Sequence, residues 1–113
     1  MVKLNMVQSL NKSLHDNMEK DKTILVMGED VGVNGGVFRV TDGLYKKFGK
    51  ERVIDSPIAE SAILGTAIGM AIAGLKPVIE MQFSGFSYLM MHQLEGNAAR
   101  MRTRSRGLFT VPL

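Results

Sequence analysis

The chain has 113 residues, of which 45% are hydrophobic and 22% charged, a composition typical of one small globular domain or of a piece of a larger one. It contains no cysteine, which excludes a disulfide scaffold, a thiol nucleophile and a cysteine zinc site, and favours a cytoplasmic protein. The net charge of +3 is modest. Four arginines lie near the end without the aromatic residues or motif of a nucleic-acid module, so we expect no nucleic-acid partner: Arg100, Arg102, Arg104 and Arg106.

The longest apolar run, residues 62–75, is interrupted by glycine and threonine. It is shorter than the roughly 18 residues that a membrane span needs, so we expect no membrane partner.

The first predicted element is a helix with Asn5 as its N-cap. Its apolar positions recur at helical spacing, at Met6, Val7, Leu10, Leu14 and Met18. A short, continuously apolar run from Ile24 to Met27, stopped by Gly28, predicts a strand that is buried on both faces. The glycine-rich stretch VGVNGGVFRV, residues 31–40, predicts a loop.

The middle of the chain predicts a short helix, a strand and a long helix. Thr41 is placed to cap a short helix that runs through Leu44, Tyr45 and Phe48 and ends at Gly49. RVIDS, residues 52–56, predicts the second strand, and Pro57 suits the first turn of a helix from Ile58 to about Ala73, with Gly74 as its stop.

The last part predicts a third strand at KPVIEMQ (76–82), a fourth helix at 84–105 and the beginning of another strand at LFTVPL (108–113). Strands that alternate with helices indicate an α/β fold with a parallel sheet and helices on both faces. Because the chain stops inside a predicted strand, we expect an incomplete domain.

The helix over 58–73 is apolar nearly all round, which predicts a buried central helix. Gly65 and Gly69 in this helix predict close packing against another backbone, either within the fold or across a subunit contact.

Glu60 is the only acidic residue in the apolar helix predicted over 58–73, and no basic residue lies between Arg52 and Lys76. A carboxylate in the first turn of a helix can simply interact with the helix dipole. Its location favours a second interpretation, because three polar segments follow the three predicted strands: MGED, SPIAE and EMQFSGF. Ligands bind at this edge of open α/β sheets, so Glu29, Glu60 and Gln82 are expected to share the wall of a crevice.

GEDVGVNGG does not match a dinucleotide fingerprint or a P-loop, and its two acids would repel phosphate. We interpret it as a loop that approaches the non-phosphate part of a ligand, or as a plain connection. His15 is expected to be solvated and His92 lacks the partners of a metal site, so no metal ligand is predicted.

Residues 25–83, LVMGEDVGVNGGVFRVTDGLYKKFGKERVIDSPIAESAILGTAIGMAIAGLKPVIEMQF, closely resemble the β subunit of thiamine diphosphate-dependent 2-oxoacid dehydrogenases. Within that family the sequence is most similar to the branched-chain (2-oxoisovalerate) type, with the pyruvate type close behind. The resemblance covers essentially the whole chain but only about the first third of such a subunit. It implies that residues 1–113 are the N-terminal part of a transketolase-like pyrimidine-binding domain.

The resemblance also implies roles for individual residues. Glu60 matches the catalytic glutamate that hydrogen-bonds N1′ of the cofactor's aminopyrimidine. The other matching positions line the cofactor at Glu29, Ile58, Ala59, Gln82, Phe86, Ser87, Tyr88 and Leu89, and face the 2-oxoacid at Gln82, Phe83, Ser84 and Gly85. Arg106 departs from the family pattern, which has glycine there.

The partners are implied in the same way. They are an α subunit that holds the diphosphate and Mg²⁺, a second β subunit in an α2β2 assembly, and a lipoyl acyltransferase that accepts the acyl group. The family's catalytic histidine lies beyond Leu113, so this chain alone is expected to be inactive. The alternatives are a pyruvate dehydrogenase β subunit, a transketolase or deoxyxylulose-phosphate synthase module, and a non-catalytic assembly fragment.

Overall fold

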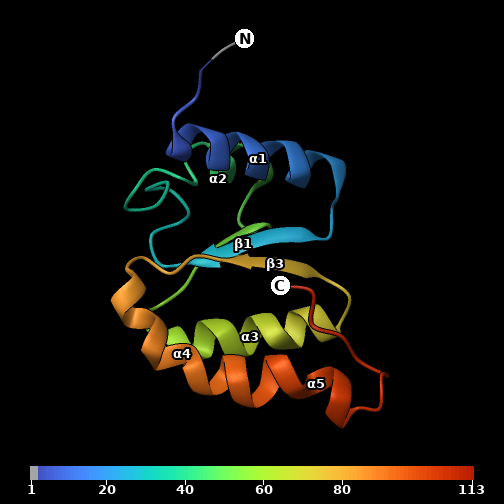
Figure 1. Ribbon diagram of the computed structural model, residues 1–113. Helices are drawn as coiled ribbons and strands as arrows, with labels where there is room; N and C mark the ends of the chain where they lie inside the picture. The colour runs from blue at the N-terminus through green and yellow to red at the C-terminus, as the bar shows by residue number, and fades with distance from the viewer. Residues whose placement is uncertain (1–2) are drawn as a thin grey trace.

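A three-stranded parallel sheet lies between two layers of helices in the computed structural model, which describes residues 3–113 (Figure 1). The strands are β1 (Ile24–Gly28), β2 (Val53–Asp55) and β3 (Lys76–Ile79), in the order β2-β1-β3. Val26 of β1 lies opposite Val53 and Val78. The helices α1 and α2 cover one face, and α3 with α4 and α5 covers the other, which confirms the predicted fold class.

The first helix, α1 (Met6–Lys20), begins at the predicted N-cap. The Gln8 N–H donates to Asn5 Oδ1 over 2.9 Å, and the Asn5 N–H donates to Gln8 Oε1 over 3.0 Å. This reciprocal capping box satisfies two donors that a helix start leaves free.

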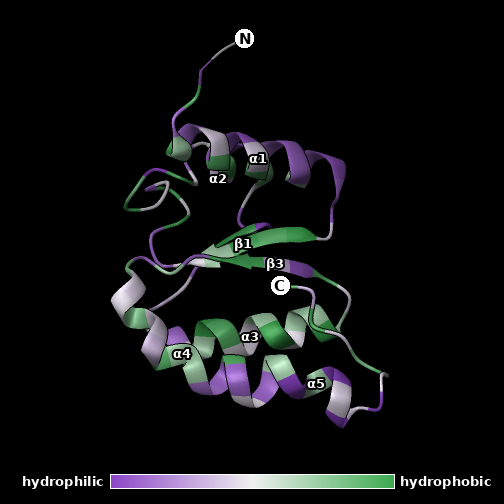
Figure 2. Cartoon of the chain, in the orientation of Figure 1, coloured by the Kyte–Doolittle hydropathy of each residue, from purple (hydrophilic) through white to green (hydrophobic). Residues whose placement is uncertain are grey.

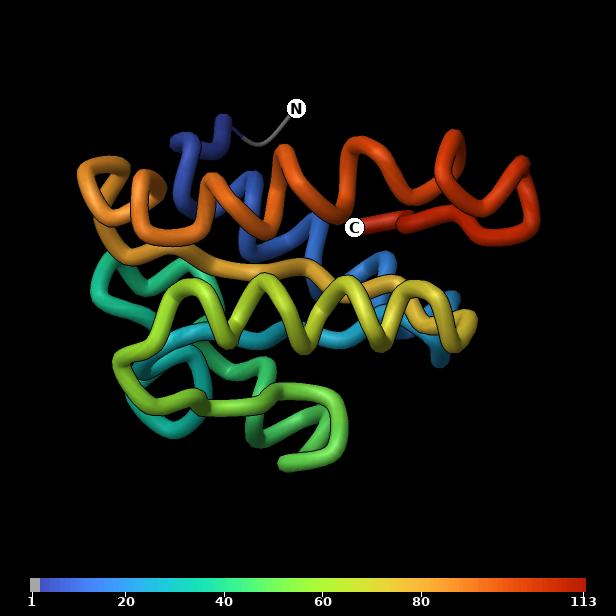
Figure 3. Tube along the Cα trace, turned by 90° about the horizontal axis from the view of Figure 1, so that it is seen from below, coloured from blue at the N-terminus to red at the C-terminus, as the bar shows by residue number. Residues whose placement is uncertain are grey.

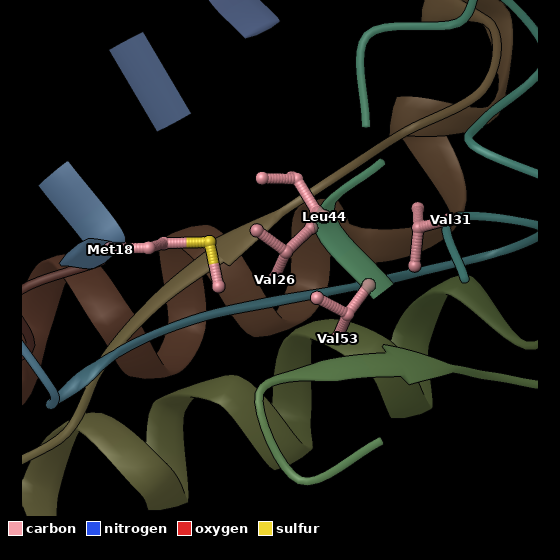
Figure 4. Close-up of a cluster of buried hydrophobic side chains, with 5 residues drawn as sticks. All are labelled: Met18, Val26, Val31, Leu44 and Val53. Carbon is pink, nitrogen blue, oxygen red and sulfur yellow. The ribbon is translucent and has the colours of Figure 1, made fainter. Parts of the chain in front are cut away.

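The face under α1 and α2 (Leu44–Phe48) is filled by one cluster of fully buried side chains, shown in Figure 4. It draws one residue each from α1, β1, the following loop, α2 and β2: Met18, Val26, Val31, Leu44 and Val53. Burial of each such side chain contributes about 1.5–3 kcal/mol, so this cluster holds the loop and α2 against the sheet.

The central helix α3 (Glu60–Ile72) packs on two sides, as its uniform apolarity predicts. Ile63 contacts Leu25 and Met27 on the sheet, whereas Leu64 and Ile68 form a second cluster with Met90 of α4. Figure 2 shows α3 mostly in the hydrophobic colour and α1 largely in the hydrophilic one.

The two glycines of α3 do not bring another backbone close within the described residues. A Cβ atom built at Gly65 would lie 3.7 Å from the Gln93 side chain, an ordinary contact, and one built at Gly69 would meet nothing within 4 Å. Close packing inside the fold is therefore not their role here, and a subunit contact stays a prediction.

The predicted fourth helix is continuous but irregular. It consists of a 3₁₀ turn η1 (Ser84–Phe86), α4 (Ser87–Gln93), a π-helical segment η2 (Leu94–Ala98) and α5 (Ala99–Arg104). None of the helices within residues 3–113 combines the length and apolarity that crossing a membrane requires.

Two local predictions about helix starts are wrong. Thr41 does not cap α2, because its buried hydroxyl donates to the Val31 carbonyl over 2.8 Å, and Gly43 takes the N-cap position. Pro57 lies before α3 rather than in its first turn, since Ala59 is the N-cap.

Two further predictions fail because of tertiary packing. Residues 108–113 form no strand: they run back along α5 (Figure 3), where Val111 packs against the cluster of α3 and α4. His15 is half-buried rather than solvated, with its ring centroid 5.9 Å from that of Phe48.

The turn after α5 keeps a glycine-like conformation at Arg106. This arginine has a φ of 54° and Gly107 a φ of 84°, both in the left-handed region. The Gly107 N–H donates to the Arg102 carbonyl over 2.8 Å and the Arg106 N–H to the Thr103 carbonyl over 3.1 Å, so the last helical carbonyls are satisfied. Arg106 thus holds a backbone conformation that favours glycine, the residue that the family resemblance implies at this position.

We predict that Arg106→Gly raises the free energy of unfolding by about 1 kcal/mol, because glycine adopts this φ without the steric cost that a Cβ brings. Urea denaturation of the chain measures the change. The control, Arg102→Gly, lies inside α5 and should lower the free energy of unfolding by roughly 0.5–1 kcal/mol. A loss of stability in both variants would contradict the prediction.

Candidate functional site

The three strands end at one edge of the sheet, and polar residues follow each of them. Glu29 comes directly after β1, Ser56 after β2 and Glu80 after β3. The parallel register keeps these ends together, and α3 begins at the same end of the sheet with Glu60 (Figure 1). The polar segments after the three strands therefore lie at one edge of the sheet, and a ligand-binding crevice there stays a prediction.

Glu60 is both a helix-start acid and a buried one. It is the first residue of α3, and only 7% of it is exposed. Its N-cap Ala59 gives the helix no side-chain hydrogen bond, so the Glu60 carboxylate is the acidic group nearest the free N–H groups of the first turn. The position suits the helix-dipole interpretation, and the ligand-binding interpretation stays a prediction.

Acidic side chains gather around Glu29 without a basic partner in the described part of the chain. Glu29 is 8% exposed, and burial raises the pKa of its carboxyl group, with the charges of Glu60 and Asp30 raising it further. Burial likewise raises the pKa of Glu80, helped by the charges of Glu29 and Asp30. The ion pairs within residues 3–113 involve none of Glu29, Glu60 and Glu80.

The same edge holds buried polar atoms without a hydrogen-bond partner. In the described part of the chain these atoms are Glu29 Oε1, Ser56 Oγ and Glu80 Oε2, one after each strand. An unsatisfied buried group costs about 1–3 kcal/mol, so native proteins rarely keep one without a reason. Buried acceptors beside uncompensated negative charge suit a ligand that brings N–H donors or a positive charge. The residues present thus fit a nitrogen-rich ring.

Gly28 allows the ends of β1 and β3 to come this close. A Cβ atom at this position would lie 2.9 Å from the Glu80 carbonyl oxygen and 2.9 Å from Val31 Cγ1. The sequence marks Gly28 only as the stop of a strand, whereas the structure shows that it makes room for Glu80.

Gln82 joins the segment after β3 to the loop after β1. Its Nε2 donates to Asp30 Oδ2 over 3.1 Å and makes a longer contact of 3.4 Å with the Glu29 carbonyl. Asp30 has a φ of 57°, a left-handed conformation that is uncommon for a residue with a side chain. The structure therefore brings Glu29 and Gln82 together as predicted.

The remaining candidates form the outer part of the edge. Phe83 and Phe86 are in edge-to-face contact, with ring centroids 5.8 Å apart. Ser87 Oγ donates to the Ser84 carbonyl over 2.6 Å, and the Ser61 hydroxyl donates to the Leu89 carbonyl. Seven of the predicted residues are exposed to solvent: Ile58, Phe83, Ser84, Gly85, Phe86, Tyr88 and Leu89.

The edge is open rather than enclosed. A cavity of about 380 Å³ lies on the α1 side of β3, lined among others by Leu14, Ile24 and Val78, and it contains none of the predicted site residues. Exposed fractions of 84% for Ile58 and 82% for Tyr88 show that nothing in the described residues packs over them.

Sequence reasoning missed four residues of this edge: Asp30, Phe38, Ser56 and Glu80. Ser56 and Glu80 lie inside the predicted strands 52–56 and 76–82, and they follow β2 and β3 only because the observed strands are shorter; Asp30 stands beside Glu29. Phe38 carries no such signal, because only the folded loop brings its ring to within 5.6 Å of Phe83. Within residues 3–113 no cluster of acidic or histidine side chains is arranged to hold a metal ion.

We predict that Glu29→Gln raises the free energy of unfolding at pH 7 by on the order of 1 kcal/mol, because it removes a charge that is costly to bury. The folded-state pKa of Glu29 is raised, so native stability falls as pH rises from the usual value of 4.5 through the folded-state value. The gain in the variant should therefore appear above this window and vanish below it.

Urea denaturation between pH 3.5 and 8 measures this difference. Glu51→Gln, at an exposed position, is the control and should follow the wild type at every pH. A variant curve parallel to the wild-type curve over the whole range would contradict the prediction.

Comparison with known proteins places this geometry in context. A family model described as "Transketolase, pyrimidine binding domain" matches residues 2–113. The chain is 56% identical over 113 residues to the protein named "Pyruvate dehydrogenase E1 component subunit beta" from Acholeplasma laidlawii, covering 100% of this chain and 35% of the relative. The proteins of the same name from Bacillus subtilis (strain 168) and Mycoplasma genitalium are 50% identical over 113 residues and 48% identical over 112 residues.

The match covers 100% of the chain and 35% of the B. subtilis protein, and 99% of the chain and 34% of the M. genitalium protein. The chain thus spans about a third of the length of the curated relatives that it matches. All three are named for the pyruvate type, and not for the branched-chain type that the sequence resemblance ranks first.

Proposed function

Because the chain belongs to the family of transketolase pyrimidine-binding domains, we propose that its acidic edge binds the aminopyrimidine of thiamine diphosphate in a 2-oxoacid dehydrogenase. The observation that carries this proposal is the buried carboxylate of Glu60, which has no counter-ion among the described residues. Its neighbour Glu29 is also buried, and Glu29 Oε1 has no hydrogen-bond partner among those residues. In this proposal residues 1–113 are the N-terminal part of a β subunit, and the enzyme decarboxylates a 2-oxoacid and passes the acyl group to a lipoyl group.

When bound, thiamine diphosphate supplies a carbon nucleophile for the keto carbon of the 2-oxoacid. Glu60 holds a proton at N1′ of the aminopyrimidine, in a hydrogen bond that gains strength because its carboxyl group is withdrawn from water. The raised pKa of Glu29 makes its protonated form more accessible, so it limits the charge that accumulates around Glu60. The protein contribution is thus orientation and electrostatics, while the cofactor carries the difficult chemistry.

The other predicted residues shape the space around this hydrogen bond. Ile58 and Ala59 precede Glu60, and the segment from Phe86 to Leu89 begins α4 at the same edge. We assign to these residues the lining of the cofactor, and to the segment from Gln82 to Gly85 the wall that faces the 2-oxoacid. The hydrogen bond of Gln82 to Asp30 supports this assignment, because it fixes the segment relative to the carboxylates.

Pyruvate is the substrate that we propose first, because the relatives are named for it, and a branched-chain 2-oxoacid is the alternative. The proposed partners are an α subunit that holds the diphosphate and Mg²⁺, a second β subunit in an α2β2 assembly, and a lipoyl acyltransferase. The exposed Ile58 and Tyr88 beside the site support a second polypeptide there. The cysteine-free sequence is consistent with a cytoplasmic location.

We predict that Glu60→Gln lowers kcat at least about 100-fold in a complete β subunit assembled with its α subunit, because an amide cannot hold or exchange the proton at N1′. Release of CO₂ from pyruvate measures kcat, and calorimetry measures the Kd of thiamine diphosphate, which should change less than kcat. Glu51→Gln is the control and should behave as the wild type. Normal turnover by Glu60→Gln would refute the role of this residue.

The same assembly separates the alternatives. Transfer of a two-carbon unit to an aldehyde acceptor in place of acyl transfer to a lipoyl group would indicate a transketolase or deoxyxylulose-phosphate synthase module. Failure of the wild-type assembly to bind thiamine diphosphate would refute the proposed cofactor and favour a non-catalytic assembly role. A panel of 2-oxoacids then ranks pyruvate against the branched-chain substrates.

A further inference from the structure

Three phenylalanine rings form a continuous row at the open edge. The ring centroids of Phe38 and Phe83 lie 5.6 Å apart with planes at 73°, and those of Phe83 and Phe86 lie 5.8 Å apart with planes at 86°. Both pairs have the edge-to-face geometry that aromatic rings prefer. Phe83 is the middle ring, so its orientation depends on both neighbours.

The row is not part of the hydrophobic core. Phe38, Phe83 and Phe86 are 53%, 48% and 42% exposed. A half-exposed ring has few other contacts to fix its side-chain rotamer, and the neighbouring ring then becomes a major constraint on it. Removal of Phe38 should therefore free Phe83 more than the same removal would in a packed core.

Phe38 comes from a loop that is itself well defined. Within it, the Gly36 N–H donates to the Asp30 carbonyl over 2.8 Å, and the Thr41 hydroxyl anchors the loop to Val31. Next to Phe38, Arg39 has a φ of 62° and forms an ion pair with Asp42 at 2.8 Å. These contacts give Phe38 a fixed base from which to orient another ring.

A polar contact joins the same two segments at a second point. Gln82, next to Phe83, donates to Asp30 of the same loop over 3.1 Å. The loop after β1 therefore holds the segment from Gln82 to Phe86 through one hydrogen bond and one ring contact.

We infer that Phe38 is a positioning residue of the proposed site: its ring orients Phe83 and, through Phe83, fixes Phe86 where the aminopyrimidine binds. This inference rests on the proposed function and extends it to a residue outside the cofactor and substrate walls. Phe38 acts on the site through Phe83 and need not contact cofactor or substrate itself.

The test uses a complete β subunit assembled with its α subunit and measures the Kd of thiamine diphosphate by calorimetry. Phe38→Ala should raise this Kd about two- to tenfold, the range that an aromatic edge contact is worth. It should leave kcat, measured with both cofactor and 2-oxoacid saturating, within about twofold, because Glu60 is untouched. Phe38→Tyr keeps the ring and should restore the wild-type Kd.

The neighbouring Val37→Ala is the matched control, since Val37 is exposed, belongs to the same loop and has no ring. It should not change the Kd. A double-mutant cycle isolates the ring contact: in a Phe83→Ala background, Phe38→Ala should weaken binding no further. Phe38→Leu, which keeps apolar volume without a ring edge, replaces Phe38→Ala in this cycle if the latter does not fold.

Four outcomes would overturn the inference: an unchanged Kd in Phe38→Ala, failure of Phe38→Tyr to restore binding, an equal effect of Val37→Ala, or additive effects in the cycle. These outcomes leave the proposed function standing, provided that the wild-type assembly binds thiamine diphosphate. A wild-type assembly that does not bind the cofactor would instead remove the proposed function and this inference together.

Discussion

The site depends on negative charge that the fold buries without a counter-ion. Glu29 and Glu60 are each less than a tenth exposed, and the charge of Glu60 contributes to the raised pKa of Glu29. An arrangement that served stability alone would place an arginine or a lysine here, because an unpaired buried charge is expensive. Glu29 Oε1 and Glu80 Oε2, which have no hydrogen-bond partner among the described residues, support the proposal that a ligand supplies donors here.

The physical features that make this edge unfavourable for stability also fix the positions of its carboxylates. Because α3 is apolar on two sides, it is held between the sheet and α4, and Glu60 at its first residue can hardly move toward water. The absence of a side chain at Gly28 lets Glu80 approach the end of β1. The positive φ of Asp30 belongs to the same set of strained features, which tend to persist where function requires them.

Sequence patterns predicted the helices and strands whose apolar and capping residues directly reflect which of their faces and ends are buried. The capping box at Asn5, the continuous apolar strand β1 and the all-round apolarity of α3 each specify a local structure, and the order of strands and helices specifies the parallel sheet. Thr41, Pro57 and residues 108–113 were not predictable in this way, because their conformations depend on contacts distant in sequence, such as the Thr41 bond to Val31. Glu60 could be placed at this edge from the sequence because it follows the second predicted strand. The contact between Phe38 and Phe83 could not be predicted, because it forms only in the folded loop.

The acidic character of the edge also supports the division of the cofactor between two polypeptides that we propose. The diphosphate of thiamine diphosphate is strongly anionic, and Glu29, Asp30, Glu60 and Glu80 would repel it. The described residues place no cation against these acids in an ion pair. An edge of this kind suits the nitrogen-rich ring and not the phosphates, which supports our proposal that a second chain holds the diphosphate end. The exposed Ile58 and Tyr88 would be covered as that chain closes the site.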